Sequence, residues 1–295
     1  MPRRRKWTKK VVIAHFEDGR GHGTHGSYQP WQNVREFTNS WGNETRVPSV
    51  LFDRPVQTMS YLERSMLFYL EFNWTPAFGA RGKKRRDLKR LLGPKPPPIR
   101  DYRDQFPIDP NFTVEEAKKR GIVHSRFPET GLPLVMNVDA FVPRGWTDED
   151  QTLEFWDAKP TSRQKNKRVL DKLSLHSAFA DHVEGTHHIF DEKAIPRFVR
   201  RNIELVRSAL PHPLAEVSPP ELFTTHLERI KGMFPTTSRC SVSRFCSNYD
   251  EKYGLEYGSA IQVLWCLVWS QQLELDLDVE ELEQTMACRV VRSDD

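Results

Sequence analysis

Two buried strands that carry charged residues are predicted from the stretches LPLVMNVDAFV (residues 132–142) and TLEFWDAKP (residues 152–160). A polar turn, PRGWTDEDQ, separates them, so the two strands are predicted to form a hairpin. Asp139 lies inside the first strand, and Asp157 and Lys159 lie at the end of the second. Because side chains alternate along a strand, Asp157 and Lys159 are expected on one face.

These charges have a chemical interpretation and a structural one. An acid in an apolar strand is costly unless it is paired or holds a metal. Carboxylate oxygens suit Mg²⁺, or Mn²⁺ in its place, and Asp139 followed by Asp157-x-Lys159 supplies the minimal PD-(D/E)xK nuclease pattern. A bound metal would polarise a phosphate, while the lysine would position or deprotonate water, or offset charge. The alternative is a salt bridge at a strand end, because Asp-x-Lys also occurs by chance.

A third acid precedes the hairpin. The stretch QTMSYLERSMLFYLEFN (residues 57–73) predicts an amphipathic helix, since its apolar residues recur at helical spacing. Ser60 is the predicted N-cap, and Glu63 at the third position after it completes a capping box. Glu63 is therefore expected to cap the helix whatever else it does.

The remaining pattern predicts a mixed sheet with helices on its faces. Helices are expected over residues 112–122, 165–183 and 194–210, and a further strand over residues 186–192. Residues 211–220 hold four prolines and predict a linker. Three helices are expected next, and LELDLDVE (residues 273–280), which alternates apolar and acidic residues, predicts a strand; together they predict a small winged-helix-like domain.

Charge is unevenly distributed over the 295 residues, although the formal net charge is only +4. Residues 1–100 hold 20 Lys and Arg against 8 Asp and Glu, whereas residues 270–295 hold 2 against 8. The basic residues 1–100 predict phosphate contacts; the alternatives are a flexible arm and a solvated basic run. The acidic residues 270–295 predict a basic protein partner or a solvated end. The candidate DNA-binding residues are Arg20, His22, Lys83, Lys84, Arg85, Arg86, Lys165 and Lys167.

Other features narrow the class of protein. No apolar run approaches the roughly 18 residues of a membrane helix. The basic N-terminus lacks the apolar stretch of a secretory signal, and four cysteines read as free thiols. A cytoplasmic protein without a membrane partner is therefore expected. Adjacent His187 and His188 should point to opposite faces, which makes them poor joint metal ligands.

Six segments between residues 15 and 210 resemble TnsA endonucleases of Tn-seven-type transposons in type and order. They are GRGHGTHGSYQPW, YLERSMLFYLEFNW, IRDYRDQFPI, MNVDAFV, DAKP and IFDEKAIPRFVRRNIELV. The resemblance implies an α/β fold with a restriction-endonuclease-like core and a C-terminal winged-helix-like domain. The expected parts are a basic, Gly-rich arm over residues 1–47, an endonuclease domain over 48–210 and the winged-helix-like domain over 211–295.

The resemblance also implies an activity and partners. Glu63, Asp139, Asp157 and Lys159 match the family's catalytic positions, and its metal site would involve Glu63, Asp139, Asp157 and Ala158. Some members carry Gln where this chain has Asp157, so the full carboxylate pattern favours activity. The implied protein cuts the 5′ strands of double-stranded DNA at transposon ends, with a TnsB-type transposase and a TnsC-type AAA+ ATPase regulator. A stand-alone restriction or repair nuclease and a non-catalytic adaptor are the alternatives.

Overall fold

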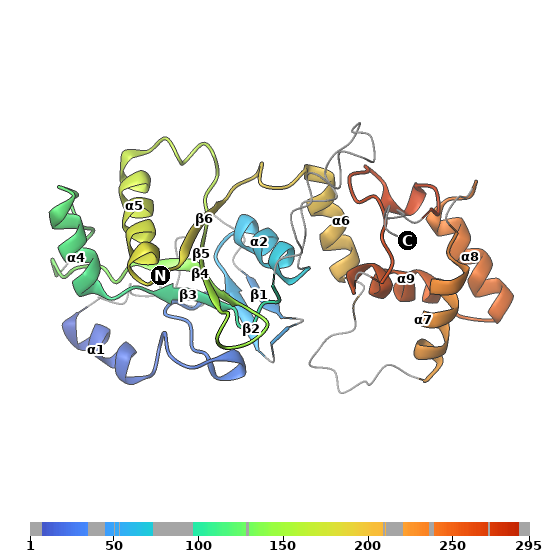
Figure 1. The fold of residues 1–295 in the computed structure, drawn as a ribbon, viewed down its shortest axis with the longest axis horizontal. Coiled ribbons are helices and arrows are strands. Elements are labelled where there is room, and N and C mark those ends of the chain that lie inside the picture. The colour runs from blue at the N-terminus through green and yellow to red at the C-terminus, as the bar shows by residue number, and fades with distance from the viewer. Residues whose placement is uncertain are drawn as a thin grey trace, which may run out of the picture. The chain divides into compact units, whose positions relative to one another are not determined.

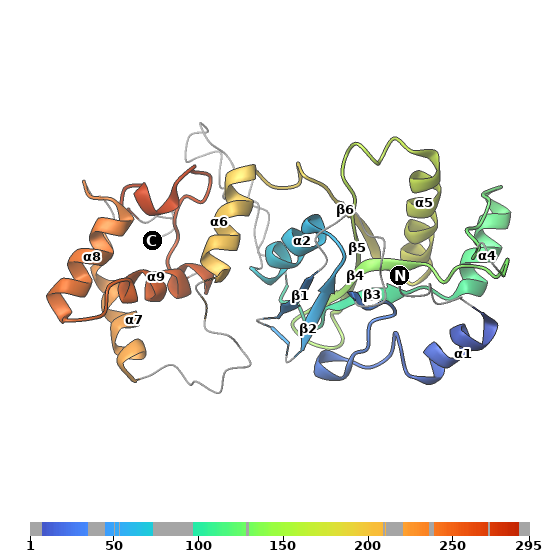
Figure 2. The same cartoon turned by 180° about the vertical axis from the view of Figure 1, so that it is seen from behind.

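A computed structural model describes residues 8–34, 45–49, 51–52, 54–72, 97–127, 130–208, 210, 221–235, 239–270 and 272–288. The chain divides into two compact units, shown in Figures 1 and 2: residues 1–67 with 97–192, and residues 68–96 with 193–295. Residues 193–210, which the sequence analysis assigned to the endonuclease domain, thus belong with the C-terminal segment.

The first unit is built on a four-stranded mixed sheet. Strand order is β3–β4–β5–β6, with antiparallel pairs except for the parallel pair β5–β6. The bounds are Arg103–Pro107 for β3, Asn137–Arg144 for β4, Thr152–Ala158 for β5 and Thr186–Phe190 for β6. The predicted hairpin of β4 and β5 and the predicted mixed sheet are therefore confirmed. The parallel pair requires a crossover, and helix α5 (Lys167–His182) supplies it.

Aromatic packing fixes helix α5 on the sheet. The rings of Phe141 and Phe155 stack with centroids 4.8 Å apart, and Phe155 meets Phe179 of α5 edge-on at 5.4 Å. Val138 and Ala180 are fully buried in the same cluster. Helix α4 (Pro110–Lys119) packs against α5, and α5 against β5 and β6, as Figure 1 shows. Apolar residues between sheet and helix thus hold the strands that carry Asp139 and Asp157.

The glycine-rich N-terminal segment packs on this unit. It contains α1 (Lys9–Glu17) and the short helix η1 (His25–Ser27), and Tyr28 and Trp31 are almost completely buried. Gly21 has φ +82°, and a Cβ there would lie 2.3 Å from Pro107 Cγ. Only glycine, which has no Cβ, allows the chain to pass this close to Pro107 at Gly21. Strands β1 (Thr45–Pro48) and β2 (Pro55–Thr58) follow as an antiparallel pair.

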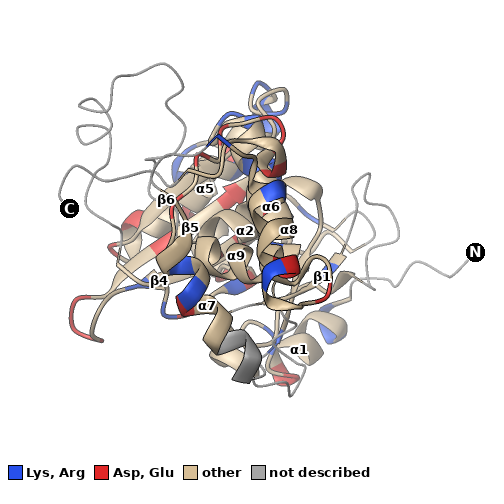
Figure 3. Ribbon diagram, turned by 90° about the vertical axis from the view of Figure 1, so that its right-hand side faces the viewer, with Lys and Arg blue, Asp and Glu red and all other residues tan. Residues whose placement is uncertain are grey.

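The second unit is helical in the part that the structure describes. Its bounds are Arg197–Ser208 for α6, Glu221–Met233 for α7, Val242–Tyr253 for α8, Ser259–Trp269 for α9 and Leu282–Gln284 for η4. The three helices predicted after the linker are therefore present. Within the described ranges of the chain, no helix is both long and apolar enough to cross a membrane. Acidic and basic residues occur on helices of both units, as Figure 3 shows.

Residues 273–280 form no strand, so the prediction of one there is wrong. Leu273, Leu275 and Leu277 are buried as the alternation predicted, yet the segment pairs with no strand. Its carbonyls bond to a side chain instead, because Asn202 Nδ2 of α6 donates to Leu277 O and Val279 O, both at 2.8 Å. Between residues 272 and 288 there is no strand, only an isolated bridge from Met286 to Ser241. The winged-helix-like domain accordingly stays a prediction.

Candidate active site

The hairpin brings the two strand acids to one place. In the β4–β5 register Ala140 pairs with Trp156, and one step further Asp139 falls opposite Asp157. The backbone N–H of Ala158 donates to Asp139 Oδ2 at 2.8 Å, so the carboxylate of one strand is bound to the end of the other. Asp157 is completely buried and Asp139 almost so. Strand pairing alone therefore creates a pair of neighbouring buried acids.

Lys159 neutralises this pair. Its Nζ lies 2.7 Å from Asp139 Oδ2, 3.1 Å from the carbonyl oxygen of Ala158 and 3.7 Å from Asp157 Oδ1. Burial lowers the pKa of Lys159, but the charges of Asp139 and Asp157 outweigh it and raise that pKa above its usual value. The side chain is thus a stable ammonium ion. It contacts three of the four residues predicted to hold a metal.

Glu63 has the capping role that the sequence predicted. It caps helix α2 (Tyr61–Glu71), since its Oε2 accepts from Met59 N at 2.8 Å and its N–H donates to Ser60 Oγ at 3.1 Å. Burial, and after it the charge of Asp139, raises the pKa of Glu63 to about 8. Gln105 Nε2 also donates to Glu63 Oε2, at 3.1 Å. Glu63 is therefore a helix cap that faces the strand acids.

Two histidines that the sequence analysis did not assign to the site bind Asp157. Its Oδ2 lies 2.6 Å from His176 Nδ1 and 2.9 Å from His187 Nε2. Burial raises the pKa of Asp157, but His176, His187 and Lys159 together hold it well below its usual range. His188 points to the other face of β6 and stacks on Trp156, with ring centroids 4.3 Å apart. The prediction that His187 and His188 point apart is thus confirmed, although His187 faces the acids.

The closest possible metal cluster differs from the predicted set. Among the described residues, the group of three Asp, Glu, His or Cys ligand atoms within 4.8 Å of one another is Asp157, His176 and His187. Glu63, Asp139 and Asp157 do not form such a group, and the ammonium of Lys159 contacts both strand acids. Asp157 Oδ1 nevertheless is a buried carboxylate oxygen with no hydrogen-bond partner among the described residues. An oxygen of this kind suits a hard divalent cation.

Lys172 is a further residue beside the site that the sequence did not indicate. It lies on α5 one turn before His176 and is half-buried. Burial, and then the charge of Lys159, lowers its pKa. No sequence signal distinguishes Lys172 from the other basic residues of α5, because its position depends on how the helix crosses the sheet.

The predicted DNA-binding residues lie in three places. Lys83, Lys84, Arg85 and Arg86 fall outside the described residues. Lys165 and Lys167 are exposed where β5 leads into α5, and Lys167 pairs with Asp171 at 3.1 Å. His22 is exposed, whereas Arg20 donates to Trp31 O at 3.2 Å. In the part of the chain that the structure describes, none of these residues therefore contacts Asp139 or Asp157.

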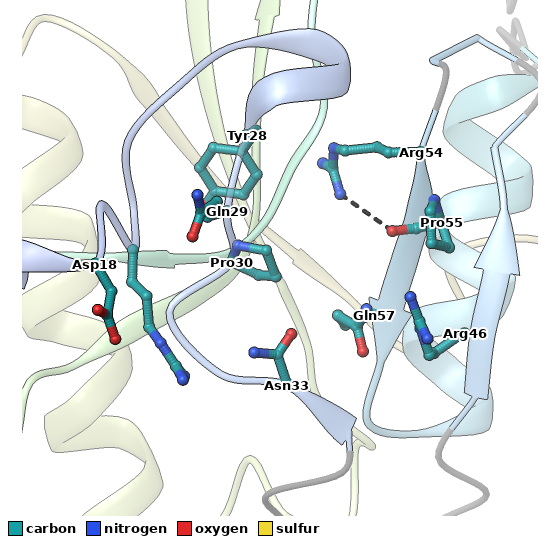
Figure 4. Close-up of a pocket in the computed structure, with 10 residues that line it drawn as sticks. Asp18, Tyr28, Gln29, Pro30, Asn33, Arg46, Arg54, Pro55 and Gln57 are labelled. Atoms are coloured by element: carbon teal, nitrogen blue, oxygen red, sulfur yellow. Dashed lines mark hydrogen bonds between the residues drawn. The ribbon is translucent and has the colours of Figure 1, made fainter. Parts of the chain in front are cut away.

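Arg20 also lines a cavity of about 490 Å³ between the N-terminal segment and β2. Figure 4 shows Arg46 and Arg54 on its other side, where the Arg54 guanidinium donates a hydrogen bond to the carbonyl oxygen of Pro55. Arg54 is already neutralised by Asp104 at 2.6 Å. The cavity is lined by Asp18, Arg20, Tyr28, Gln29, Pro30, Asn33, Arg46, Arg54, Pro55 and Gln57.

A hairpin thus presents two buried acids and a lysine beside a helical glutamate, the residues that the sequence analysis interpreted as a nuclease pattern. Comparisons with known proteins narrow the family. The family described as TnsA endonuclease C terminal matches residues 194–277. The chain is also 26% identical over 262 residues to the transposon Tn7 transposition protein TnsA of Escherichia coli, covering 87% of this chain and 82% of that protein. The matches support a TnsA-type protein and confirm the resemblance predicted from the sequence.

Proposed function

We propose that this chain is a metal-dependent DNA endonuclease that cuts the 5′, non-transferred strands at transposon ends together with a TnsB-type transposase. The similarity to TnsA supports a role as an endonuclease in transposition. The observation that carries the chemistry is the contact set of Lys159, whose ammonium reaches Asp139, Asp157 and the Ala158 carbonyl within 3.7 Å. A plain salt bridge would need one acid, not two buried ones and a main-chain oxygen.

Glu63, Asp139, Asp157 and the carbonyl oxygen of Ala158 would hold Mg²⁺, for which Mn²⁺ could substitute. All four offer oxygen ligands, which hard divalent cations prefer. Asp157 Oδ1 supports this assignment, because it is a buried carboxylate oxygen that accepts no hydrogen bond among the described residues and has only the Lys159 ammonium, 3.7 Å away, as a partner. When bound, the metal would polarise the scissile phosphate and lower the cost of charge on the leaving oxygen.

The protein's own groups would hold charge and position water. In the metal-free protein Lys159 is an ammonium ion, since the two acids raise its pKa. We propose that it offsets negative charge on the phosphate or orients the attacking water. Of the three roles that the sequence left open for Lys159, this proposal takes positioning water and offsetting charge. Lys165 and Lys167, exposed close after Lys159 in the chain, would contact the DNA backbone.

The C-terminal unit would bind a TnsC-type AAA+ ATPase regulator. Its acidic end, with two basic residues against eight acidic ones over residues 270–295, disfavours DNA and suits a basic protein surface. We retain the winged-helix-like assignment for this unit on the basis of its three helices, α7, α8 and α9.

A cleavage assay tests this function. Duplex DNA carrying a transposon end, labelled on its 5′ strand, is incubated with the protein and Mg²⁺, with and without a TnsB-type transposase. Cutting at the end of the element only when the transposase is present is the expected result. Cutting by the protein alone would identify a stand-alone nuclease. No cutting under either condition, while the two proteins still bind each other, would identify an adaptor.

A further inference from the structure

The carboxylate of Asp157 uses its two oxygens differently. Oδ2 receives two ring nitrogens, His176 Nδ1 at 2.6 Å and His187 Nε2 at 2.9 Å, whereas Oδ1 faces Lys159 at 3.7 Å and has no hydrogen-bond partner among the described residues. Asp157 and His176 are completely buried. A carboxylate with one occupied and one free oxygen cannot rotate without breaking two buried hydrogen bonds.

The geometry defines the roles of both histidines. Because a carboxylate oxygen accepts, each ring must carry a proton on the nitrogen that faces Oδ2. The other ring nitrogen of His176, Nε2, is buried without a hydrogen-bond partner among the described residues. A buried nitrogen of this kind is normally avoided, so its presence calls for an explanation. The explanation is the bond that the other side of the ring makes.

We propose that His176 and His187 are positioning residues that orient Asp157 so that Oδ1 points toward the metal. This rests on the proposed function, in which Asp157 is a ligand. Donors behind a ligating carboxylate fix its direction, and their loss typically lowers metal affinity by about 10–100-fold. The distances of 2.6 and 2.9 Å are hydrogen-bond lengths, as expected for two ring nitrogens that donate to one carboxylate oxygen.

The two donors come from different elements, which makes the arrangement specific. His176 lies on α5, which crosses from β5 to β6, and His187 lies on β6, whose parallel register pairs it with Phe155. Residues two apart on parallel neighbours face the same side, so His187 reaches Asp157 diagonally. The pair therefore clamps Asp157 from the helix side and from the strand side.

The test is titration of the full-length protein with Mn²⁺, followed calorimetrically, beside the cleavage assay. His187→Leu removes one donor at the edge strand and should lower Mn²⁺ affinity about 10–100-fold, with Asp157→Asn as the reference for loss of the ligand. His187→Gln and His176→Asn keep an N–H near the same position and should restore most of the affinity. His188→Leu, next in sequence but on the opposite face, should change nothing. Equal melting temperatures for the Leu and Gln variants would exclude a merely structural loss.

Several outcomes would overturn the proposal. The first is unchanged Mn²⁺ affinity in His187→Leu. The second is an equal loss of Mn²⁺ affinity in His187→Leu and His187→Gln, together with loss from both of Zn²⁺ that the unaltered protein binds. The third is no Mn²⁺ binding by the unaltered protein. In the second case the imidazoles would themselves be ligands. Failure of the proposed function looks different: Mn²⁺ affinity would follow the Asp157 and His187 substitutions as expected, but no variant, nor the unaltered protein, would cut DNA.

Discussion

Lys159 Nζ and Asp139 Oδ2 lie 2.7 Å apart and join the ends of two neighbouring strands. The ammonium also reaches the Ala158 carbonyl and Asp157 Oδ1, so in this state it binds the oxygens that a divalent ion would take. Under the proposed function, metal and lysine would therefore compete for part of one site, and the lysine would move when the metal binds.

Replacement of Lys159 separates its competition with the metal from its role in cleavage. Lys159→Met removes the competing cation and leaves two buried carboxylates, so Mn²⁺ affinity should rise on the order of tenfold while cleavage is lost. Titration and the cleavage assay measure both. Lys167→Met, on an exposed lysine paired with Asp171, is the control and should change neither by much. Weaker metal binding in Lys159→Met would mean that the lysine is not a competitor.

Glu63 should make the stability of the metal-free protein depend on pH. Its pKa is about 8 in the fold against an ordinary value of 4.5, so the stability present below pH 4.5 is lost as the pH rises toward 8. Glu63→Gln keeps a capping group that does not ionise. The melting temperature of Glu63→Gln relative to the unaltered protein should therefore increase between pH 5 and pH 9, by an amount equivalent to about 1.4 kcal/mol per pH unit at most.

The control for this series is Glu116→Gln. Arg120 holds the pKa of the partly buried Glu116 below its usual value, so that carboxylate stays ionised across the range. The difference caused by Glu116→Gln should be constant with pH. A constant difference for Glu63→Gln as well would show that the fold does not raise the pKa of Glu63. Glu63→Gln should also lose cleavage, if Glu63 is a metal ligand.

The strand acids are best tested by Asn rather than Ala. Asp139 accepts from Ala158 N, and Asp157 accepts from two histidines, so truncation would leave buried donors unpaired at a cost of about 1–3 kcal/mol each. Asp139→Asn and Asp157→Asn keep an acceptor oxygen but lose the charge. We expect both to fold, to bind Mn²⁺ weakly and to cut DNA at no detectable rate. Near-normal Mg²⁺-dependent cutting by either variant would show that the assigned site is wrong.

The sequence predicted the hairpin because period two and the polar turn act locally. The same periodicity placed Asp157 and Lys159 on one side, and the Ser60–Glu63 spacing predicted the cap. His176 could not be predicted, because its position depends on how α5 crosses the sheet. His187 required the parallel register with β5, which no local pattern encodes. The alternation of residues 273–280 was misread, since alternate burial occurs there without strand pairing.

Residues Lys83, Lys84, Arg85 and Arg86 should contribute to DNA binding through phosphates. Replacing all four with Gln should weaken binding and flatten the dependence of log K on log salt by roughly 0.9 for each phosphate that the variant no longer neutralises. A matched control is replacement of Lys118 and Lys119, exposed on α4. Fluorescence anisotropy over a salt series measures the slope. An unchanged slope would indicate that the basic run is only solvated.

The acidic end should bind the regulator through exposed carboxylates that can be tested without removing the unit. Cutting the chain near Leu210 is unsuitable, because α6 buries Val199 and Ile203, and Asn202 donates to Leu277 O and Val279 O. Charge reversal of Asp276, Glu280 and Glu281, all exposed, leaves that packing in place.

We expect this triple variant, each residue replaced by Lys, to lose pull-down of a TnsC-type ATPase while keeping Mn²⁺ binding and transposase-dependent cleavage. Each exposed charge is screened by salt, so the regulator affinity of the unaltered protein should itself fall as ionic strength rises. Reversal of Glu149, exposed on the β4–β5 turn of the other unit, is the control and should leave regulator binding intact. Undiminished capture of the regulator by the triple variant would reassign the acidic end to a solvated surface. It would also place the regulator's contacts elsewhere on the chain.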